Sequence, residues 1–294
     1  MRTIIEYSVR YYKNMERNSD YDSQTLSTSV EAAAMAELVI PEGSGALLAE
    51  APRIEPVVPL LLDGGPALAL TYDRRDKARE IERAKSLTLA LAEPRMARIG
   101  WSPLAVGVRA SVEPDPEGEI FVEQLLEQEL RKHPPSMHLA NSFLLQRENW
   151  WYLPRLILRL EPVHEPTPLQ RRTDSSHGLL AWNASDEKLP CARTVKVEDS
   201  SARRIGLDLP SKQGPEDGAY AALRLHDFEM PEMERKTELT LRGRVRGGGL
   251  EVESRSGSAE LGGRPGAIAR WRAERALERG CKRGLKEGYP PANL

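Results

Sequence analysis

The chain has few of the residues that usually reveal a chemistry. Its 294 residues include two cysteines, Cys191 and Cys281, which form neither a disulfide framework nor a zinc-binding spacing. Aromatic residues make up 5% of the sequence, and the net charge is −2. No apolar run approaches the roughly 20 residues that span a bilayer. We therefore expect a cytoplasmic protein with reduced thiols, and neither nucleic acid nor a membrane as its partner.

Catalytic signatures are also missing. The sequence contains no Gly-x-Ser-x-Gly elbow, Walker-type loop or dinucleotide fingerprint. No two histidines lie three or four residues apart beside a carboxylate, as metal ligands on a helix would. The five histidines are His133, His138, His164, His177 and His226. The sequence therefore identifies no catalytic residue and no metal ligand.

Glycine and proline, by contrast, are plentiful. There are 22 of each, which indicates many turns, as in a mainly β protein. Apolar and polar residues alternate from Leu104 to Val112 and again from Leu239 to Val245, and this pattern predicts strands. Asp63-Gly64-Gly65 separates two apolar runs and predicts a hairpin.

Helical signals occur nearer the N-terminus and at the end of the chain. An alanine-rich stretch predicts a helix from Ser29 to Leu38. Asp73 is placed to cap a helix over residues 74–84, and Asp115 to cap one over residues 116–133.

The last predicted helix covers residues 267–286 and is rich in arginine and lysine. Ala273, Leu277, Cys281 and Leu285 form an i, i+4 apolar stripe along it. The alternative is a nucleic-acid-binding helix. The stripe favours packing against the sheet, with the charged side facing solvent.

Composition divides the chain into four parts. Residues 1–28 are polar and turn-rich, and we expect a poorly ordered leader there. Residues 29–162 and 178–294 have the strand patterns of two domains. Residues 163–177 are rich in proline and polar side chains, which is typical of a linker.

The two domains share short patterns at a near-constant offset. Gly45-Ala46-Leu47-Leu48-Ala49 is echoed at Gly178-Leu179-Leu180-Ala181, 133 residues later. The alternating strand around Arg109 is echoed around Arg244, 135 residues later. We interpret this as a degenerate tandem duplication. The second copy is abridged, because residues 210–219 are too few to hold a counterpart of the helix at 74–84.

Ligand chemistry is concentrated where the strand ending at Thr71 meets the helix at 74–84. A helix N-terminus presents unpaired N–H groups, and nearby cations and a hydroxyl would complete a phosphate site. The candidate residues are Thr71, Arg74, Arg75 and Lys77. The alternative is a solvated helix face, paired with Glu80 or Glu82.

The order of predicted elements resembles the split-barrel flavin-binding superfamily. This group includes pyridoxamine-phosphate oxidase-like proteins and flavin- or deazaflavin-dependent oxidoreductases. The resemblance covers about residues 29–162. It rests on Gly45-Ala-Leu-Leu-Ala, Val57-Val-Pro-Leu-Leu-Leu-Asp-Gly-Gly, Leu70-Thr-Tyr-Asp-Arg-Arg-Asp-Lys-Ala-Arg and Trp101-Ser-Pro-Leu-Ala-Val-Gly-Val-Arg-Ala.

The resemblance implies a cofactor, FMN or deazaflavin, whose phosphate is held by Thr71, Arg74, Arg75 and Lys77. It further implies hydride or electron transfer on a small substrate, and either a homodimer or an intrachain pseudo-dimer. The family commonly carries a small hydroxyl residue where this chain has Asp76. Asp76 therefore either points away from the phosphate or marks a decayed site.

Other functions remain open at this stage. One alternative is a non-catalytic binding or scaffold protein on the same fold, and another is haem binding. The aromatic run Trp150-Trp151-Tyr152 has two interpretations, stacking on a flavin ring or packing in the core.

Overall fold

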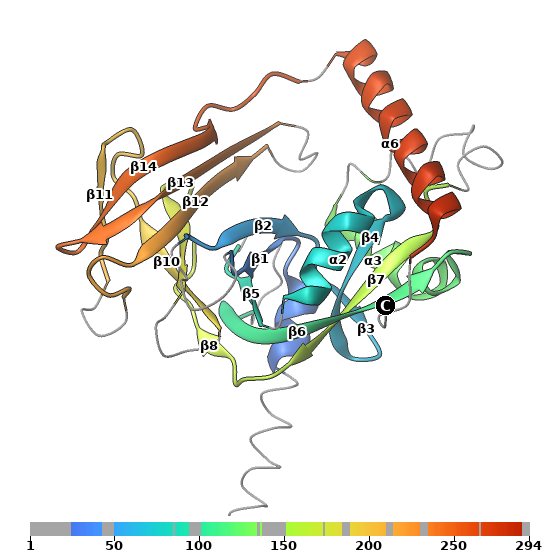
Figure 1. Cartoon of the computed structure of the whole chain (residues 1–294), viewed down its shortest axis with the longest axis horizontal. Helices are drawn as coiled ribbons and strands as arrows, with labels where there is room; N and C mark the ends of the chain where they lie inside the picture. The colour runs from blue at the N-terminus through green and yellow to red at the C-terminus, as the bar shows by residue number, and fades with distance from the viewer. Residues whose placement is uncertain are drawn as a thin grey trace, which may run out of the picture.

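The computed structural model describes residues 25–42, 50–84, 86–93, 101–133, 136, 151–172, 174–183, 189–209, 214–229, 235–264 and 266–289. In this part of the chain, two antiparallel β-sheets lie side by side and the helices lie at their periphery (Figure 1). The protein is therefore mainly β, as the sequence predicts.

The first sheet has the strand order β2-β1-β5-β6-β7-β4-β3, and β8 pairs with β6. Its strands are β1 (Ala36–Ile40), β2 (Arg53–Val57), β3 (Leu60–Leu62), β4 (Gly65–Thr71), β5 (Leu87–Leu91), β6 (Leu104–Asp115), β7 (Arg155–Pro162) and β8 (Thr167–Pro168). The hairpin of β3 and β4 confirms the turn predicted at Asp63-Gly64, where both residues have positive φ.

Chain connectivity curls this sheet into a split barrel. The edge strands β2 and β3 are joined by only Val58 and Pro59. In a flat sheet these edges would lie about 29 Å apart, at about 4.8 Å per strand. The connection from Val57 to Leu60 reaches at most about 11 Å. The sheet must therefore bend round, and its inner face encloses a core that includes Leu38, Leu89, Val106 and Leu158.

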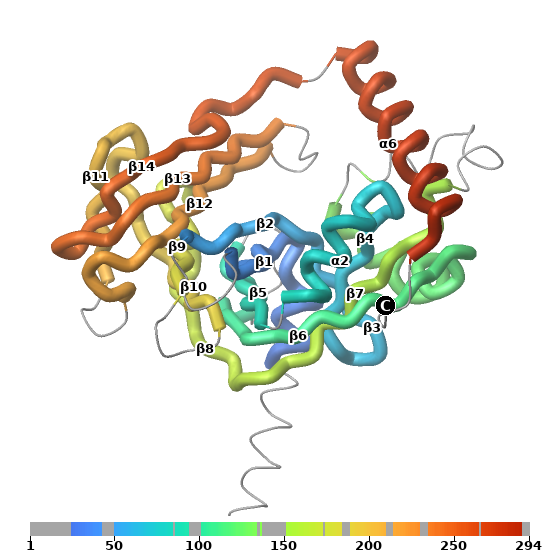
Figure 2. Tube along the Cα trace, viewed as in Figure 1, coloured from blue at the N-terminus to red at the C-terminus, as the bar shows by residue number. Residues whose placement is uncertain are grey.

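The second sheet has the strand order β10-β9-β12-β13-β14-β11. Its strands are β9 (His177–Asn183), β10 (Pro190–Lys196), β11 (Arg204–Gly206), β12 (Tyr220–Phe228), β13 (Lys236–Arg246) and β14 (Gly249–Ser258). Side chains from all six strands form one core cluster, so this sheet also curves around its own interior (Figure 2).

The two sheets have the same strand order. β10-β9-β12-β13-β14-β11 matches β2-β1-β5-β6-β7-β4 position by position, with no counterpart of β3. The predicted equivalence of the strands around Arg109 and Arg244 agrees with this match, since these strands are β6 and β13. The proposed partner of Gly178, Gly45, lies outside the described residues. By strand order the counterpart of β9 is instead β1. The shared order supports a tandem duplication.

The first helix differs from its prediction. Residues 25–32 are helical, and the chain is already in strand β1 by Ala36, so the expected helix from Ser29 to Leu38 is correct over residues 29–32 and wrong beyond them. Leu38, Val39 and Ile40 are buried on both faces of the sheet, and burial of these residues, two of them β-branched, outweighs the helical propensity of the alanines. This helix begins inside the predicted leader, and its Leu26 is part of the core.

The helix that follows β4 has no side-chain cap. It consists of the 3₁₀ turn η1 (Tyr72–Arg74) and α2 (Arg75–Arg83), and neither has the side-chain cap predicted from Asp73. Asp73 instead accepts a hydrogen bond from the Thr71 hydroxyl. Asp115 does not occupy the predicted N-cap position, because it is the last residue of β6 and neither segment of the next helix has a side-chain cap. Its carboxylate nevertheless accepts the N–H of Phe121 at 2.9 Å, in the first turns of that helix. The helix there comprises η2 (Phe121–Leu125) and α3 (Leu126–Lys132).

The last helix, α6 (Ala267–Glu287), packs through only its C-terminal half. Leu277, Cys281 and Leu285 contact the barrel near η1, whereas Ala273 and the first turns are exposed. The prediction that the apolar stripe packs against the protein is therefore correct for the C-terminal half of the helix and wrong for its first turns. Figure 1 shows α6 beside the barrel, far from the second sheet. Among the described residues, no helix has the length and apolarity needed to cross a bilayer.

The outer faces of the two sheets pack on each other through small side chains. The shared cluster contains Val39, Ile54, Ala90 and Ala105 from the first sheet, and Leu179, Ala181, Ala192 and Ala222 from the second. Strand β10 lies against β5, and β12 lies against β2. Larger polar residues continue the same face of β12 beyond this alanine-rich contact, and they create the site described next.

Candidate ligand groove between the two sheets

Strand β12 presents three large side chains to the first sheet. Side chains alternate along a strand, so Leu223 and Leu225 point into the second sheet's core while Arg224, His226 and Phe228 point outward. All three outward residues are buried, because the first sheet covers them. The imidazole of His226 stacks on the ring of Phe228, with centroids 5.8 Å apart.

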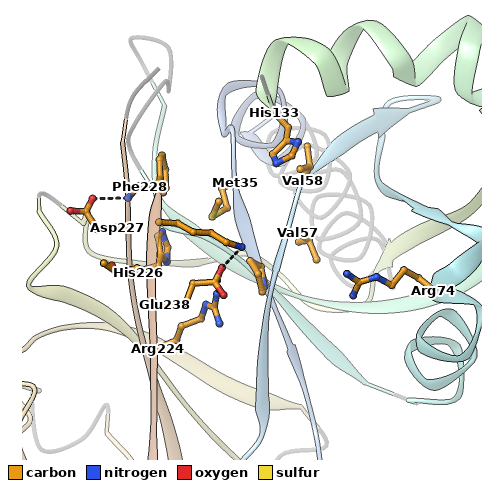
Figure 3. Close-up of a pocket in the computed structure, with 13 residues that line it drawn as sticks. Met35, Val57, Val58, Arg74, His133, Arg224, His226, Asp227, Phe228 and Glu238 are labelled. Atoms are coloured by element: carbon orange, nitrogen blue, oxygen red, sulfur yellow. Dashed lines mark hydrogen bonds and ion pairs between the residues drawn. The ribbon is translucent and has the colours of Figure 1, made fainter. Parts of the chain in front are cut away.

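A cavity of about 310 Å³ lies between β12 and the first barrel. Figure 3 shows its lining residues, with Arg224, His226 and Glu238 on the side of the second sheet and Val57 and Arg74 on the side of the first barrel. Its lining residues are Met35, Pro56, Val57, Val58, Arg74, His133, Arg224, His226, Asp227, Phe228, Lys236, Thr237 and Glu238. It combines apolar walls with charged groups, as small-molecule sites commonly do.

A second cavity, of about 410 Å³, continues from the first toward the helices of the barrel. The two cavities share the lining residues Pro56, Val57, Val58, Arg74 and His133. The two cavities therefore adjoin each other along these residues, and together they are called the groove below. His133 stands at the junction of its two parts.

His133 has one ring nitrogen available to a ligand. It is the C-cap residue that follows α3, and its Nδ1 lies 2.9 Å from the hydroxyl of Ser136. That hydroxyl donates to Glu129 Oε1 at 3.0 Å. Among the described residues, none bonds to His133 Nε2. Burial, and to a lesser extent the charge of Lys236, lower the pKa of His133 despite the nearby Glu129. The imidazole is thus held in the neutral form that binds metals.

His226 differs from His133, because both of its ring nitrogens are occupied. Its Nε2 lies 3.0 Å from Glu93, and its Nδ1 lies 3.1 Å from a nitrogen of Arg172. Arg172 also donates to Glu37. Since a guanidinium only donates, Nδ1 must accept and Nε2–H must donate, which is the neutral tautomer. Burial and the charge of Arg172 lower the pKa of His226, which agrees with a neutral imidazole.

These four residues, Glu37, Glu93, Arg172 and His226, form the buried ionic cluster. Each of them is less than 5% exposed. They come from β1, the end of β5, the segment before β9, and β12, so the cluster joins the two sheets behind the groove. Its residues bond to one another, although the buried Glu37 Oε2 has no hydrogen-bond partner among the described residues, and we assign the cluster to structure rather than to ligand binding.

Three of the four residues predicted to bind phosphate line the groove, and the fourth does not. Thr71, Arg74 and Lys77 line the inner part of the groove. Arg75 does not line it, because its guanidinium binds Glu287 and the carbonyl oxygen of Gly288 at the end of α6.

The cations on either side of Arg75 also have partners. Lys77 Nζ lies 2.6 Å from Glu55, and the largely exposed Arg74 lies 3.7 Å from Asp73. Asp76 points away from the groove, since it is 88% exposed and pairs with Arg79.

The aromatic residues after the predicted helix serve different purposes. Trp150 lies outside the described residues, and Trp151 packs in a small cluster with Cys281 and Leu277. Tyr152 lines the inner part of the groove and donates to Glu129 at 2.9 Å. Burial and the charge of Glu129 raise the pKa of Tyr152 to about 12.

Arg155 forms the floor of the same region. It is 1% exposed, and its guanidinium lies between the rings of Phe121 and Tyr152, 3.9 and 4.1 Å from their centroids. It also lies 3.8 Å from Glu129. Stacked guanidinium groups of this kind are held rigidly by cation–π attraction.

The part of the groove on the second sheet was not predicted from the sequence. The detectable signal was the alternation from Tyr220 to Phe228, which places Arg224 and His226 on one face. What could not be read from the sequence was that another sheet covers this face. Among the described residues, no group of three or more His, Cys, Asp or Glu side chains could hold a metal ion.

No protein-family model and no curated protein sequence matches the chain. Solved structures similar to it include HutZ, the haem storage protein of Vibrio cholerae. HutZ is 12% identical over 48% of this chain and 89% of its own length, with a TM-score of 0.28.

Two further similar structures span most of the chain. A haem-binding protein of Mycobacterium smegmatis is 12% identical over 90% of this chain and 98% of its own, with a TM-score of 0.31. The inhibitor of motility MotI/DgrA of Bacillus subtilis is 10% identical over 87% and 97%, with a TM-score of 0.21. Because all three TM-scores are below 0.5, the groove's own geometry has to identify its ligand.

Proposed function

We propose that this protein binds haem in the groove, with His133 as the iron ligand. The observation that carries the proposal is the state of His133, a neutral imidazole at the junction of two cavities whose Nε2 has no partner among the described residues. A histidine that ligates a metal typically has its other ring nitrogen hydrogen-bonded, and Ser136 supplies that bond.

The surroundings of His133 suit a large, flat, acidic ligand. Met35, Val57 and Val58 give an apolar wall, while Arg74, Arg224 and Lys236 provide positive charge. A porphyrin needs both, because its ring is apolar and its side chains are carboxylates. Bound haem would supply a redox-active iron. The chain's own residues would hold the ring, orient the iron ligand and exclude water from one face.

Flavin is the second candidate, and the groove suits it less well. Thr71, Arg74 and Lys77 line the inner cavity, which favours a phosphate there. However, Arg75 is bound to the end of α6, and Lys77 is paired with Glu55. A flavin phosphate would have to compete with these carboxylates, whereas His133 Nε2 has no competitor in the described part of the chain.

Titration of the full chain with haem, monitored by absorbance, tests the proposal. We expect a Soret band typical of histidine ligation. We also expect His133→Gln to abolish that band and to weaken binding at least about 100-fold, and Ser136→Ala to weaken it about 10-fold. His164→Gln is the matched control, because His164 lies outside the groove. Unchanged haem binding by His133→Gln would refute the assignment.

A parallel titration with FMN tests the second candidate. Flavin binding that is lost in the double variant Arg74→Ala, Lys77→Ala, together with no haem binding, would favour the flavoprotein. Binding of neither ligand would favour a scaffold function.

A further inference from the structure

We infer that Arg224 is a receptor for a carboxylate at the outer end of the groove, and that Glu238 occupies its place while the groove is empty. This inference deepens the proposed function, because haem carries two carboxylates. It rests on different residues from the iron ligand and can be tested separately.

The state of Arg224 is the first observation. The residue is 6% exposed and lines the outer cavity. Its Nε and Nη2 atoms are buried and make no hydrogen bond within the described structure. Nη2 lies 3.3 Å from Glu238 Oε1, which is close enough for an ion pair but not in hydrogen-bonding geometry. A guanidinium has five donors in a planar fork, so Arg224 retains unused capacity for a bidentate carboxylate.

The position of Glu238 is the second observation. Glu238 lies on β13 directly opposite His226, and its carboxylate accepts a hydrogen bond from Lys236 at 3.0 Å. Figure 3 shows this carboxylate above Arg224 at the edge of the cavity. Its side chain is 37% exposed, so it can turn toward solvent. A ligand carboxylate could then take its place between Arg224 and Lys236.

A role in stabilising the fold explains the buried position of Arg224 poorly. A buried arginine with one imperfect ion pair loses its hydration without full compensation, and replacing such a group with an apolar side chain is often neutral or stabilising. Arg155, which is also buried, is stacked between two rings, whereas no aromatic ring in the described part of the chain stacks on Arg224. Ligand binding gives a reason for a charge at this position.

The first experiment compares haem with haem dimethyl ester, which keeps the iron and ring but lacks the acids. We expect wild-type protein to bind haem at least 10-fold more tightly than the ester. Arg224→Met should bind haem only as weakly as the ester, with the Soret band unchanged. Arg242→Met is the matched control, since Arg242 is a paired arginine on β13 that does not line the groove. Equal binding of haem and ester by wild type would overturn the inference.

The second experiment uses no haem, so that a failure of the proposed function can be distinguished. Thermal unfolding is measured in sodium formate and in sodium chloride at equal ionic strength. We expect formate to raise the melting temperature of wild type and Arg242→Met, but not that of Arg224→Met. If haem is not bound but this selective shift is present, the carboxylate site stands without haem. Absence of the shift overturns the inference.

A third readout separates ligand binding from a structural role. In chloride, Arg224→Met should melt at or above the wild-type temperature. A clearly lower melting temperature would mean that Arg224 holds the sheets together, and the carboxylate site would then be rejected.

Discussion

The cations at the start of α2 and the guanidinium of Arg224 make an instructive comparison. These cations, Arg74, Arg75 and Lys77, are called the α2 cluster. They lie close together in the sequence, yet Arg75 and Lys77 are paired with carboxylates of the same chain. Arg224 is a single cation between two leucines. It is buried and lies 3.3 Å from Glu238, but its Nε and Nη2 atoms make no hydrogen bond to any described residue. The density of positive charge in the sequence pointed to the α2 cluster. The buried hydrogen-bond donors of Arg224 that lack partners point instead to Arg224 as the residue that can bind a ligand.

The difference follows from solvation. A partly exposed cation gains little from a carboxylate, because water screens the attraction. A buried cation without full hydrogen bonding is costly, and such groups are uncommon in folded proteins. An unsatisfied buried guanidinium in a cavity wall therefore carries more information about ligands than several paired cations on a helix.

The largest expected effect comes from breaking the buried ionic cluster behind the groove. Arg172→Ala leaves Glu37 without its counter-charge, and we expect the free energy of unfolding to fall by about 3–5 kcal/mol. Urea denaturation monitored by circular dichroism measures it. The neighbouring Arg171→Ala is the control, because Arg171 is exposed and should cost under about 1 kcal/mol. Equal effects would show that the cluster does not join the sheets.

A smaller effect is expected where α6 closes over the α2 cluster. A Cβ on Gly284 would lie 2.2 Å from the carbonyl oxygen of Tyr72, so Gly284→Ala forces the helix away. We expect a loss of about 1–3 kcal/mol, with faster hydrogen exchange over residues 277–287. Gly263→Ala, which has open space around it, is the control. Unchanged exchange would contradict the packing described.

The third prediction concerns pH. The pKa of His133 and the pKa of His226 are both lowered, mainly by burial, from an ordinary value of 6.5. The unfolded chain therefore takes up protons at a higher pH than the folded chain does. The free energy of unfolding should fall as pH drops below about 6.5. His133→Gln should show a shallower fall between pH 7.5 and 5.5. A slope identical to that of wild type would mean that His133 does not titrate abnormally.

The smallest effect is expected at the α2 cluster itself. Arg75→Ala removes a partly exposed ion pair with Glu287, and we expect a loss of at most about 1 kcal/mol. Haem affinity should not change, because Arg75 does not line the groove. A marked fall in haem or FMN affinity would show that the α2 cluster binds the ligand. It would contradict the conclusion that Arg224, and not this cluster, marks the ligand site.

Local patterns in the sequence predicted many of the elements. The Asp63-Gly64 turn, the alternation in β6 and β13, and the final helix all depend on residues close together in the chain. The helix expected from Ser29 to Leu38 ends early because burial of Leu38, Val39 and Ile40 between strands depends on distant partners. The Asp73 cap failed for a local reason, because its carboxylate accepts a hydrogen bond from the hydroxyl of Thr71, two residues earlier.

The candidate site was predicted only in part. Thr71, Arg74 and Lys77 do line the groove, because the end of β4 and the start of α2 are adjacent in sequence. His133 directly follows helix α3, whereas Arg224 lies on β12 of the second sheet, 91 positions further along the chain. Nothing in the local pattern of either residue indicates that the other faces it.

The amino-acid sequence by itself determined a strand-rich chain with two similar halves, since turn residues and alternation act over a few positions. Only the tertiary structure decided which charges are paired and which remain unsatisfied. That outcome depends on which faces become covered when the two sheets pack, and burial changes the free energy of a charge far more than its neighbours in sequence do.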